Sequence, residues 1–395
     1  LYMDARAEKE SRTLISLLGA DRIFALTGNV MNASLCLPKM MWMQRQEQDQ
    51  LSGTQAFVFS SKDYVIARLT GEVVSDQTTC ATTGAMNLAT HTWASELLGA
   101  ASLSPALMPR ILPSHALAGT VHEKGSMESG LPEGLPVYAG AGDAGAATLA
   151  SGIANAGEYS IHVGTSSWVS AMADTPMSGE GIFNLAAIPE GKVINAVPFL
   201  NGGNVHAFLA RIFGKSEQTL DYASVHRFLL QSPPGSHGVM ALPYLSGERF
   251  PVMDPNVRGT YVGVSAETTR ADLVRAMIEG VAFSIRQGLD RIGRTVRYVS
   301  VIGGGAQEEV FCQILSDVLS FPVTAFAHAQ FLPSLAMASC VRFAQGDISS
   351  YAPFLDEARH FRDARVFRPR NAAVYETIYR KYLGLYPLMT GWYGT

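Results

Sequence analysis

One acidic residue stands where a glycine-rich loop meets the start of a predicted helix. Residues 136–149 read PVYAGAGDAGAATL, so a short apolar run passes through glycines to Asp143 and then into an alanine-rich segment. A carboxylate at such a loop is placed to act as a general base toward a bound hydroxyl group. An Asp just ahead of an alanine-rich helix is also typical of an N-cap, which stabilises a helix by about 1 kcal/mol. Asp143 is therefore a candidate base, with the helix cap as the alternative.

Two further turns carry residues that can bind phosphate or a nucleoside. Gly164-Thr165-Ser166 offers hydroxyls and backbone N–H groups at the tip of a predicted hairpin, where phosphate oxygens can be held. Gly303-Gly304-Gly305, followed by Ala306, lies between a predicted strand and a predicted helix. Backbone without Cβ atoms can approach a ligand closely there. Each segment is also compatible with a plain tight turn, and the G-x-G-x-x-G dinucleotide fingerprint is absent.

A third glycine motif is excluded as a phosphate site. Gly214-Lys215-Ser216 ends like a P-loop, but Leu209 occupies the position of the required upstream glycine. No strand is predicted before it, so the chain has no Walker A motif at this place.

The predicted elements give an α/β chain that positions these residues. We expect a strand at 137–141 with a helix at 143–151, a hairpin at 157–173, a long helix at 269–293 and a βαβ unit at 298–325. An apolar run at 56–59 predicts a short strand, and 72–93 is predicted to be irregular. The predicted domain boundary lies beside the hairpin, which divides the chain into residues 1–156 and 157–395.

Composition narrows the class of protein. A chain of 395 residues is long enough for two domains, and a net charge of −4 gives no electrostatic case for binding nucleic acid. No run is apolar enough for a bilayer, and no segment predicts a membrane partner or a signal peptide, so we expect a cytoplasmic protein. The four cysteines are scattered and the nine histidines lack metal-ligand spacing, which predicts free thiols and no protein metal site.

The order of the motifs resembles the FGGY family of carbohydrate kinases, and within it the xylulokinases. The segments that carry the resemblance span nearly the whole chain: Thr27-Gly28-Asn29, Leu37-Pro38-Lys39, Lys62-Asp63-Tyr64, Leu69-Thr70-Gly71-Glu72, Gly142-Asp143-Ala144, Gly164-Thr165-Ser166, Pro243-Tyr244-Leu245-Ser246-Gly247-Glu248-Arg249, Glu279-Gly280-Val281-Ala282-Phe283 and Ile302-Gly303-Gly304-Gly305-Ala306.

The resemblance implies an actin-like, ribonuclease H-like ATPase fold with a sugar-binding N-terminal domain (1–156) and a nucleotide-binding C-terminal domain (157–395). It implies ATP-dependent phosphorylation of a pentulose, with D-xylulose as the first choice, and Mg²⁺ as the cofactor of ATP. Asp143 would be the catalytic base, and Asp143 and Ala144 would contact the sugar. The nucleotide contacts would be Gly164, Thr165 and Ser166 for the phosphates, and Gly303, Gly304, Gly305, Ala306 and Gln307 for adenosine.

Departures from the family pattern leave alternatives open. Ala144 stands where many xylulokinases have an Asn that contacts the sugar, so another sugar or polyol is the first alternative. The family's Asp-x-Gly-Thr hairpin has no counterpart, and the chain starts at Leu1 inside a predicted helix. We therefore expect a truncated N-terminal domain with impaired activity, and the second alternative is a non-catalytic fragment that binds sugar or nucleotide. The sequence leaves the oligomeric state open, with a homodimer as one option.

Overall fold

A computed structural model describes residues 4, 6–47, 53–179, 181–293, 295–326, 329–359 and 364–393. The chain forms two compact units, each built from separate stretches of sequence. The first unit comprises Leu1–Ala150, Met172–Asn195 and Leu332–Asp356, and the second comprises Ser151–Ala171, Ala196–Phe331 and Glu357–Thr395. A domain boundary at residue 156 stays a prediction. None of the helices in the described ranges is long and apolar enough to cross a membrane.

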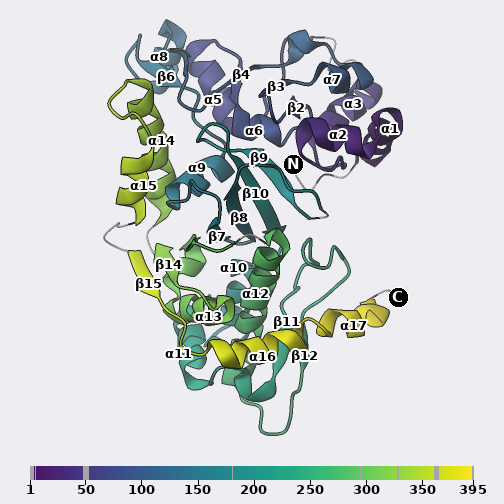
Figure 1. The fold of residues 1–395 in the computed structure, drawn as a ribbon, viewed down its shortest axis with the longest axis vertical. Coiled ribbons are helices and arrows are strands. Elements are labelled where there is room, and N and C mark those ends of the chain that lie inside the picture. The colour runs from purple at the N-terminus through teal and green to yellow at the C-terminus, as the bar shows by residue number, and fades with distance from the viewer. Residues whose placement is uncertain are drawn as a thin grey trace. The chain divides into compact units, whose positions relative to one another are not determined.

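The first unit alternates helices with short paired strands (Figure 1). Strand β1 pairs in parallel with β4, whereas β2 pairs with β3 and β5 with β6 in antiparallel fashion. Its elements are α1 (Glu8–Leu18), α2 (Ala20–Thr27), α3 (Cys36–Gln46), α5 (Ser61–Thr70), β1 (Val74–Asp76), α6 (Gln77–Ala81), β2 (Met86–Asn87), β3 (Thr92–Trp93), α7 (Ser95–Ala100), η1 (Pro105–Leu107), β4 (Arg110–Leu112), β5 (Leu117–Thr120), α8 (Glu123–Ser129), β6 (Pro136–Tyr138), α9 (Asp143–Ala150), β9 (Phe183–Ala186), α14 (Leu332–Ala344) and α15 (Ala352–Arg359).

Two predictions for the first unit are wrong. Residues 56–59 form no strand; Phe57 and Phe59 instead pack with Trp93 against a buried cluster that includes Leu14 and Leu97. Their apolar character reflects burial, and in so short a run periodicity cannot distinguish a buried loop from a strand. The segment 72–93 is not irregular either, because it contains β1, α6, β2 and β3.

The second unit is built on most of a sheet whose strand order is β15-β14-β13-β7-β8-β10-β9. The predicted hairpin, long helix and βαβ unit are confirmed, with β13 parallel to both β14 and β7. Its elements are β7 (Glu158–Val163), β8 (Ser167–Ala173), β10 (Val193–Phe199), α10 (Gly203–Ile212), α11 (Tyr222–Gln231), η2 (Ser236–Gly238), β11 (Met240–Leu242), β12 (Thr260–Val262), α12 (Arg270–Ile292), β13 (Tyr298–Ile302), η3 (Gly304–Gln307), α13 (Glu309–Leu319), β14 (Val323–Phe326), η4 (Ala329–Phe331), β15 (Ala364–Phe367), α16 (Ala372–Tyr382) and α17 (Leu385–Tyr393).

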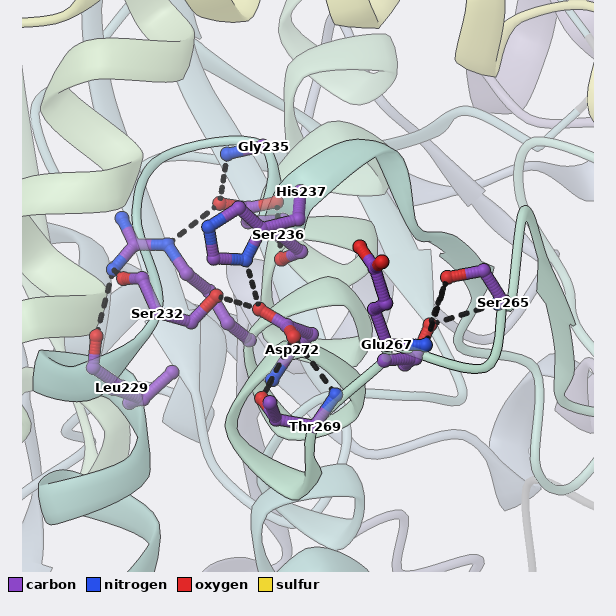
Figure 2. Close-up of polar contacts among 12 residues, drawn as sticks. Leu229, Ser232, Gly235, Ser236, His237, Ser265, Glu267, Thr269 and Asp272 are labelled. Atoms are coloured by element: carbon purple, nitrogen blue, oxygen red, sulfur yellow. Dashed lines mark hydrogen bonds and ion pairs between the residues drawn. The ribbon is translucent and has the colours of Figure 1, made fainter.

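Helix α12 is the main buried helix of the second unit, and its start is fixed by a polar cluster (Figure 2). Thr269 and Asp272 form a capping box, in which each side chain accepts from the other residue's backbone N–H. Asp272 also accepts from Ser232 at 2.6 Å and lies 2.8 Å from the His237 ring. These hydrogen bonds hold the pKa of the Asp272 carboxyl well below its usual range, against the opposing effect of burial. The cluster thus fixes the loop after α11 onto α12, which backs the sheet.

Candidate functional site

The tip of the β7–β8 hairpin is held by the N-terminus of α10. Within the turn, the Gly164 N–H donates to the Ser166 carbonyl at 2.9 Å. The N–H groups of Gly203 and Asn204 then donate to the carbonyls of Gly164 and Thr165 at 2.7 and 3.0 Å. A Cβ atom on Gly203 would lie 2.4 Å from the Gly164 carbonyl oxygen, so only glycine permits this approach. The hairpin tip and the helix terminus therefore form one rigid element.

The glycine turn after β13 packs against the end of β7. Gly303 has φ +89° and ψ −175°, a conformation that is essentially restricted to glycine. A Cβ atom there would lie 2.6 Å from the Val163 carbonyl oxygen, and one on Gly305 would lie 2.6 Å from Val163 Cγ1. At Gly304 the nearest atom would be the Val163 carbonyl oxygen at 4.0 Å. Two of the three glycines thus serve the close packing of the turn, whereas Gly304 leaves open space beside it.

The hairpin tip and the glycine turn border one cavity of about 700 Å³ in the second unit. Pockets of this size are typical of small-molecule and cofactor sites. The lining contains five of the residues that we predicted to contact nucleotide: Gly164, Thr165, Gly304, Gly305 and Gln307. Ser166, Gly303 and Ala306 are not among the residues that line it. The structure thus brings the two predicted turns together, while the contacts of each residue with nucleotide stay predictions.

Sequence reasoning missed most of the remaining cavity wall. The missed lining residues come from the end of β7, from α10, from α11 and the segment just before it, and from the end of the glycine turn: Val163, Gly203, Asn204, His206, Ala207, Leu220, Tyr222, Val225 and Glu308. The pair Gly202-Gly203 ahead of a predicted helix is the one local signal that could have found this wall, since glycines at a helix start permit close approach.

The side chains of Cys312 and Glu308 brace the glycine turn. The Cys312 thiol is buried and lies 3.8 and 3.7 Å from the carbonyl oxygens of Gly305 and Ala306, and burial raises its pKa to about 12. Glu308 Oε1 accepts from the Val310 N–H at 3.0 Å and lies 2.8 Å from Nδ1 of His226 on α11. These contacts connect the turn to α13 and α11. Cys312 is therefore a packing residue, in line with the prediction of free thiols.

Asp143 lies in the first unit, at the first residue of α9. The carbonyl of Gly142 accepts the first helical hydrogen bond, from Ala146 at 3.0 Å, so Gly142 and not Asp143 takes the N-cap position. The exposed Asp143 carboxylate accepts from the N–H of its neighbour Ala144 at 2.8 Å. Among the residues that the structure describes, no Lys, Arg or His forms an ion pair with it. The carboxylate is thus placed at a helix start and is open to a ligand, with Ala144 beside it.

A buried ion-pair cluster anchors the loop that carries Asp143. The ammonium group of Lys62 lies 2.6 Å from Asp63 and 3.1 Å from Asp76, and it donates to the Ala139 carbonyl at 3.0 Å. Both carboxylates are almost fully buried, at 2% and 0% exposure. Asp76 in turn accepts from the Thr79 hydroxyl at 2.6 Å.

The same cluster supports the start of α9. A Cβ atom on Gly142 would lie 2.8 Å from Thr79 Oγ1, and one on Gly145 would lie 2.8 Å from Thr78 Oγ1. Helix α14 packs on the same helix (Figure 1). The position of Asp143 is therefore determined by side chains on α5, β1 and α6, which are far from it in the sequence.

Within the described residues, no group of three or more His, Cys, Asp or Glu side chains is arranged to hold a metal ion. In kinases Mg²⁺ is bound by one or two carboxylates together with substrate phosphates, so a preformed cage of protein ligands is not required. The exposed carboxylate of Asp143 is compatible with that mode of binding.

Comparison with known proteins identifies the class. The chain matches the N-terminal domain of the FGGY family of carbohydrate kinases over residues 1–150 and the C-terminal domain over residues 159–331. The chain therefore belongs to the FGGY family of carbohydrate kinases, as its motifs predicted. Its fold is the actin-like ATPase fold of that family, and the prediction that it is a carbohydrate kinase is confirmed.

The names of individual relatives point to more than one sugar-derived substrate. A xylulose kinase of Staphylococcus xylosus is 30% identical over 337 residues, which are 84% of this chain and 68% of that protein. A gluconokinase of Bacillus subtilis is 26% identical over 365 residues, which are 89% of this chain and 70% of that protein. The crystal structure of ligand-bound xylulose kinase from Lactobacillus acidophilus has a TM-score of 0.87 at 25% identity, and the match covers all of this chain and 80% of that one.

Proposed function

We propose that this chain transfers the γ-phosphoryl group of ATP to a hydroxyl group of a pentulose, with D-xylulose as the first candidate. Residues 1–156 would hold the sugar and residues 157–395 the nucleotide. The cavity between the hairpin tip and the glycine turn carries this proposal, since both turns that we predicted to contact nucleotide line it in a member of this family.

The chemistry requires one base and a fixed nucleotide. The sugar oxygen forms a bond to the γ-phosphorus, the bond from that phosphorus to the β–γ bridging oxygen breaks, and ADP leaves. Asp143 accepts the hydroxyl proton as the new bond forms, and Ala144 lies against the sugar. Gly164, Thr165 and Ser166 orient the phosphates, and the Gly303–Gln307 turn orients adenosine. Mg²⁺, carried by the nucleotide phosphates, supplies charge neutralisation when it is bound.

The structure supports these assignments because the hairpin tip and the loop that carries Asp143 are each held in a fixed position. Phosphoryl transfer depends mainly on the alignment of the reactants and on stabilisation of charge. The hairpin tip is fixed by the two hydrogen bonds from α10, and the Asp143 loop is fixed by the Lys62 cluster. Both partners of the reaction would thus meet groups that are held in place before they bind.

A substrate panel tests the proposal. The natural protein is assayed for ADP release with D-xylulose, D-ribulose, D-gluconate and xylitol, each at several concentrations. We expect the highest kcat/KM with D-xylulose, and product analysis should find the phosphate ester of the sugar. ADP release that does not depend on any added sugar would contradict the proposal.

A second substrate, D-gluconate or another polyol, is favoured by two observations. Ala144, beside Asp143, has no polar side chain with which to contact the sugar, and a gluconokinase is among the relatives. A kcat/KM for D-gluconate above that for D-xylulose would establish this alternative. Binding of nucleotide and sugar without turnover would establish the non-catalytic alternative.

A further inference from the structure

Glu248 is buried, does not line the cavity, and has a carboxylate that hydrogen-bond donors surround. Its Oε1 accepts from the backbone N–H groups of Leu200 and Arg249 at 2.6 and 2.8 Å. Its Oε2 accepts from the side-chain amide of Asn201 at 2.9 Å. Because both oxygens act as acceptors, a protonated carboxyl group would turn its hydrogen toward a donor. The hydrogen-bond pattern is therefore complete only with the ionised form of Glu248.

Asn201 connects the loop that carries Glu248 to the cavity wall. Its side-chain amide also donates to the Gly247 carbonyl at 2.7 Å, and its side-chain oxygen accepts from the Leu245 N–H at 2.9 Å. The same oxygen accepts from the side chain of Asn204 at 3.3 Å, and Asn204 lines the cavity. Asn201 is thus held by the loop on one side and holds the start of α10 on the other.

The start of α10 in turn holds the hairpin tip. The two N–H groups that donate to the tip belong to Gly203 and Asn204, two and three residues after Asn201. On the hairpin, the Ser167 hydroxyl donates to the backbone carbonyl of Asn201 at 3.0 Å. A displacement of Asn201 would therefore move the turn that we assign to the nucleotide phosphates.

Other contacts anchor the loop that carries Glu248. Glu248 and Asp254 exchange two backbone hydrogen bonds, at 2.8 and 2.9 Å. The Asp254 carboxylate accepts from the hydroxyl of Tyr386 on α17 at 3.0 Å. The Phe250 ring meets that of Phe199, at the end of β10, edge-to-face with centroids 5.8 Å apart. The Glu248 carboxylate is thus a fixed point against which the segment after β10 is placed.

We propose that Glu248 is a positioning residue for nucleotide binding, because its carboxylate fixes Asn201 and, through Asn201, the start of α10 and the hairpin tip. This inference rests on the proposed function, since it requires that the cavity binds nucleotide. Nucleotide that needs the hairpin tip in place binds more tightly when Glu248 is ionised. Affinity for ADP should therefore depend on a carboxylate that ADP does not touch.

The charge of Glu248 changes near neutral pH. Burial raises the pKa of its carboxyl to about 7, against the effect of its hydrogen bonds. The titratable side chains that interact with it electrostatically include Tyr244 and Tyr382, and burial raises the pKa of both phenols above the ordinary value of 10. The guanidinium of the adjacent Arg249 stays charged. Of these four groups, Glu248 alone titrates between pH 5.5 and 8.5.

Calorimetric titration of ADP into wild type and Glu248→Gln at pH 5.5 and 8.5 tests the inference. The amide of Gln, like a protonated carboxyl group, must turn a hydrogen toward a donor. At pH 8.5 we expect Glu248→Gln to bind ADP about tenfold more weakly than wild type. At pH 5.5 wild type carries the proton too, so the two Kd values should agree within about twofold. The ratio of the two values removes the titration of ADP itself.

Glu279→Gln is the matched control, because Glu279 is another buried carboxylate that accepts from a backbone N–H, that of Gly235 at 2.9 Å. Its oxygens also accept from Ser236, Arg275 and Tyr375. The substitution should lower the Tm, because it weakens a buried ion pair. It should leave the Kd for ADP within about twofold of wild type at both pH values, which separates a loss of stability from a loss of position.

A second substitution, Asn201→Ala, tests the route from Glu248 to the cavity. It removes the side-chain donor that faces Glu248, so the amide of Gln no longer meets a donor there. Adding Glu248→Gln to Asn201→Ala should therefore change ADP affinity less than twofold at pH 8.5. A full tenfold effect in the Asn201→Ala background would contradict action through Asn201. Should Asn201→Ala fail to fold, the comparison at two pH values still tests the inference.

Two results of the pH comparison would overturn the inference. The first is equal ADP affinity of wild type and Glu248→Gln at pH 8.5, and the second is a loss of affinity that is the same at both pH values. If wild type binds no ADP, the inference fails together with the nucleotide part of the proposed function. If wild type binds ADP and phosphorylates sugar while Glu248→Gln matches its affinity, the proposed function stands and the inference alone fails.

Discussion

Replacement by Ala should have different effects at two neighbouring glycines of the turn after β13. At Gly303 it should lower the free energy of unfolding, and at Gly304 it should lower the affinity for ADP. Gly303→Ala places a methyl group 2.6 Å from the Val163 carbonyl oxygen at a backbone conformation of φ +89° and ψ −175°. Such a conformation costs a residue other than glycine about 1–3 kcal/mol. Overpacking against backbone adds about 1–3 kcal/mol. We therefore expect Gly303→Ala to lower the free energy of unfolding by roughly 2–6 kcal/mol.

Gly304→Ala is the matched control, because its methyl group meets nothing closer than 4.0 Å. Its free energy of unfolding should stay within about 0.5 kcal/mol of wild type. Since Gly304 lines the cavity, the methyl group takes space from the ligand, and ADP affinity should fall about tenfold, or about 1.4 kcal/mol.

Urea unfolding and ADP calorimetry on the same preparations measure both effects. Equal stability of Gly303→Ala and Gly304→Ala would refute the conclusion that Gly303 is needed for close packing. Wild-type ADP affinity in Gly304→Ala would refute the assignment of the turn to the nucleotide site.

Two further predictions concern buried charge. Lys62→Met leaves Asp63 and Asp76 buried without a counter-charge, so the free energy of unfolding should fall by about 3–5 kcal/mol, and turnover of the natural protein should fall with it. Urea unfolding measures the loss of stability. Fully additive effects of Lys62→Met and Asp76→Asn would contradict an energetic coupling between Lys62 and Asp76. Burial raises the pKa of Glu248 to about 7 from an ordinary 4.5. The folded state therefore holds a proton that the unfolded chain has lost, and stability falls as pH rises between those values. Glu248→Gln should remove this contribution to the pH dependence of the free energy of unfolding. If urea unfolding from pH 4.5 to 8 gives the same pH dependence for Glu248→Gln as for wild type, the raised pKa of Glu248 is contradicted.

Local signals predicted the parts of the site that lie within single turns. Gly164-Thr165-Ser166 and Gly303-Gly304-Gly305 stand at ends of strands with clear patterns, and the structure places both turns at one cavity. Asp143 was found in the same way, because glycines before an alanine-rich helix mark a helix start. The helix at 269–293 followed from its apolar spacing.

Tertiary packing supplied what the sequence did not predict. His206, Leu220 and Val225 share a cavity wall because α10 and α11 pack together, and no local pattern predicts that contact. The Lys62 cluster joins residues 62, 63, 76 and 139 through burial of charge, which has no signature in the composition of those segments. The apolar run at 56–59 misled for the opposite reason, since burial in a core does not require a strand.

Turnover of Asp143→Asn in the natural protein tests the central claim most directly. The substitution keeps the size of the side chain and removes its ability to accept a proton. Positioned bases contribute about 10²–10⁴-fold to such reactions, so kcat for D-xylulose should fall by at least about 10²-fold. The Kd for ADP should stay within twofold of wild type, because Asp143 belongs to the first unit and the nucleotide cavity to the second. A wild-type kcat in Asp143→Asn would contradict the claim that this carboxylate is the base.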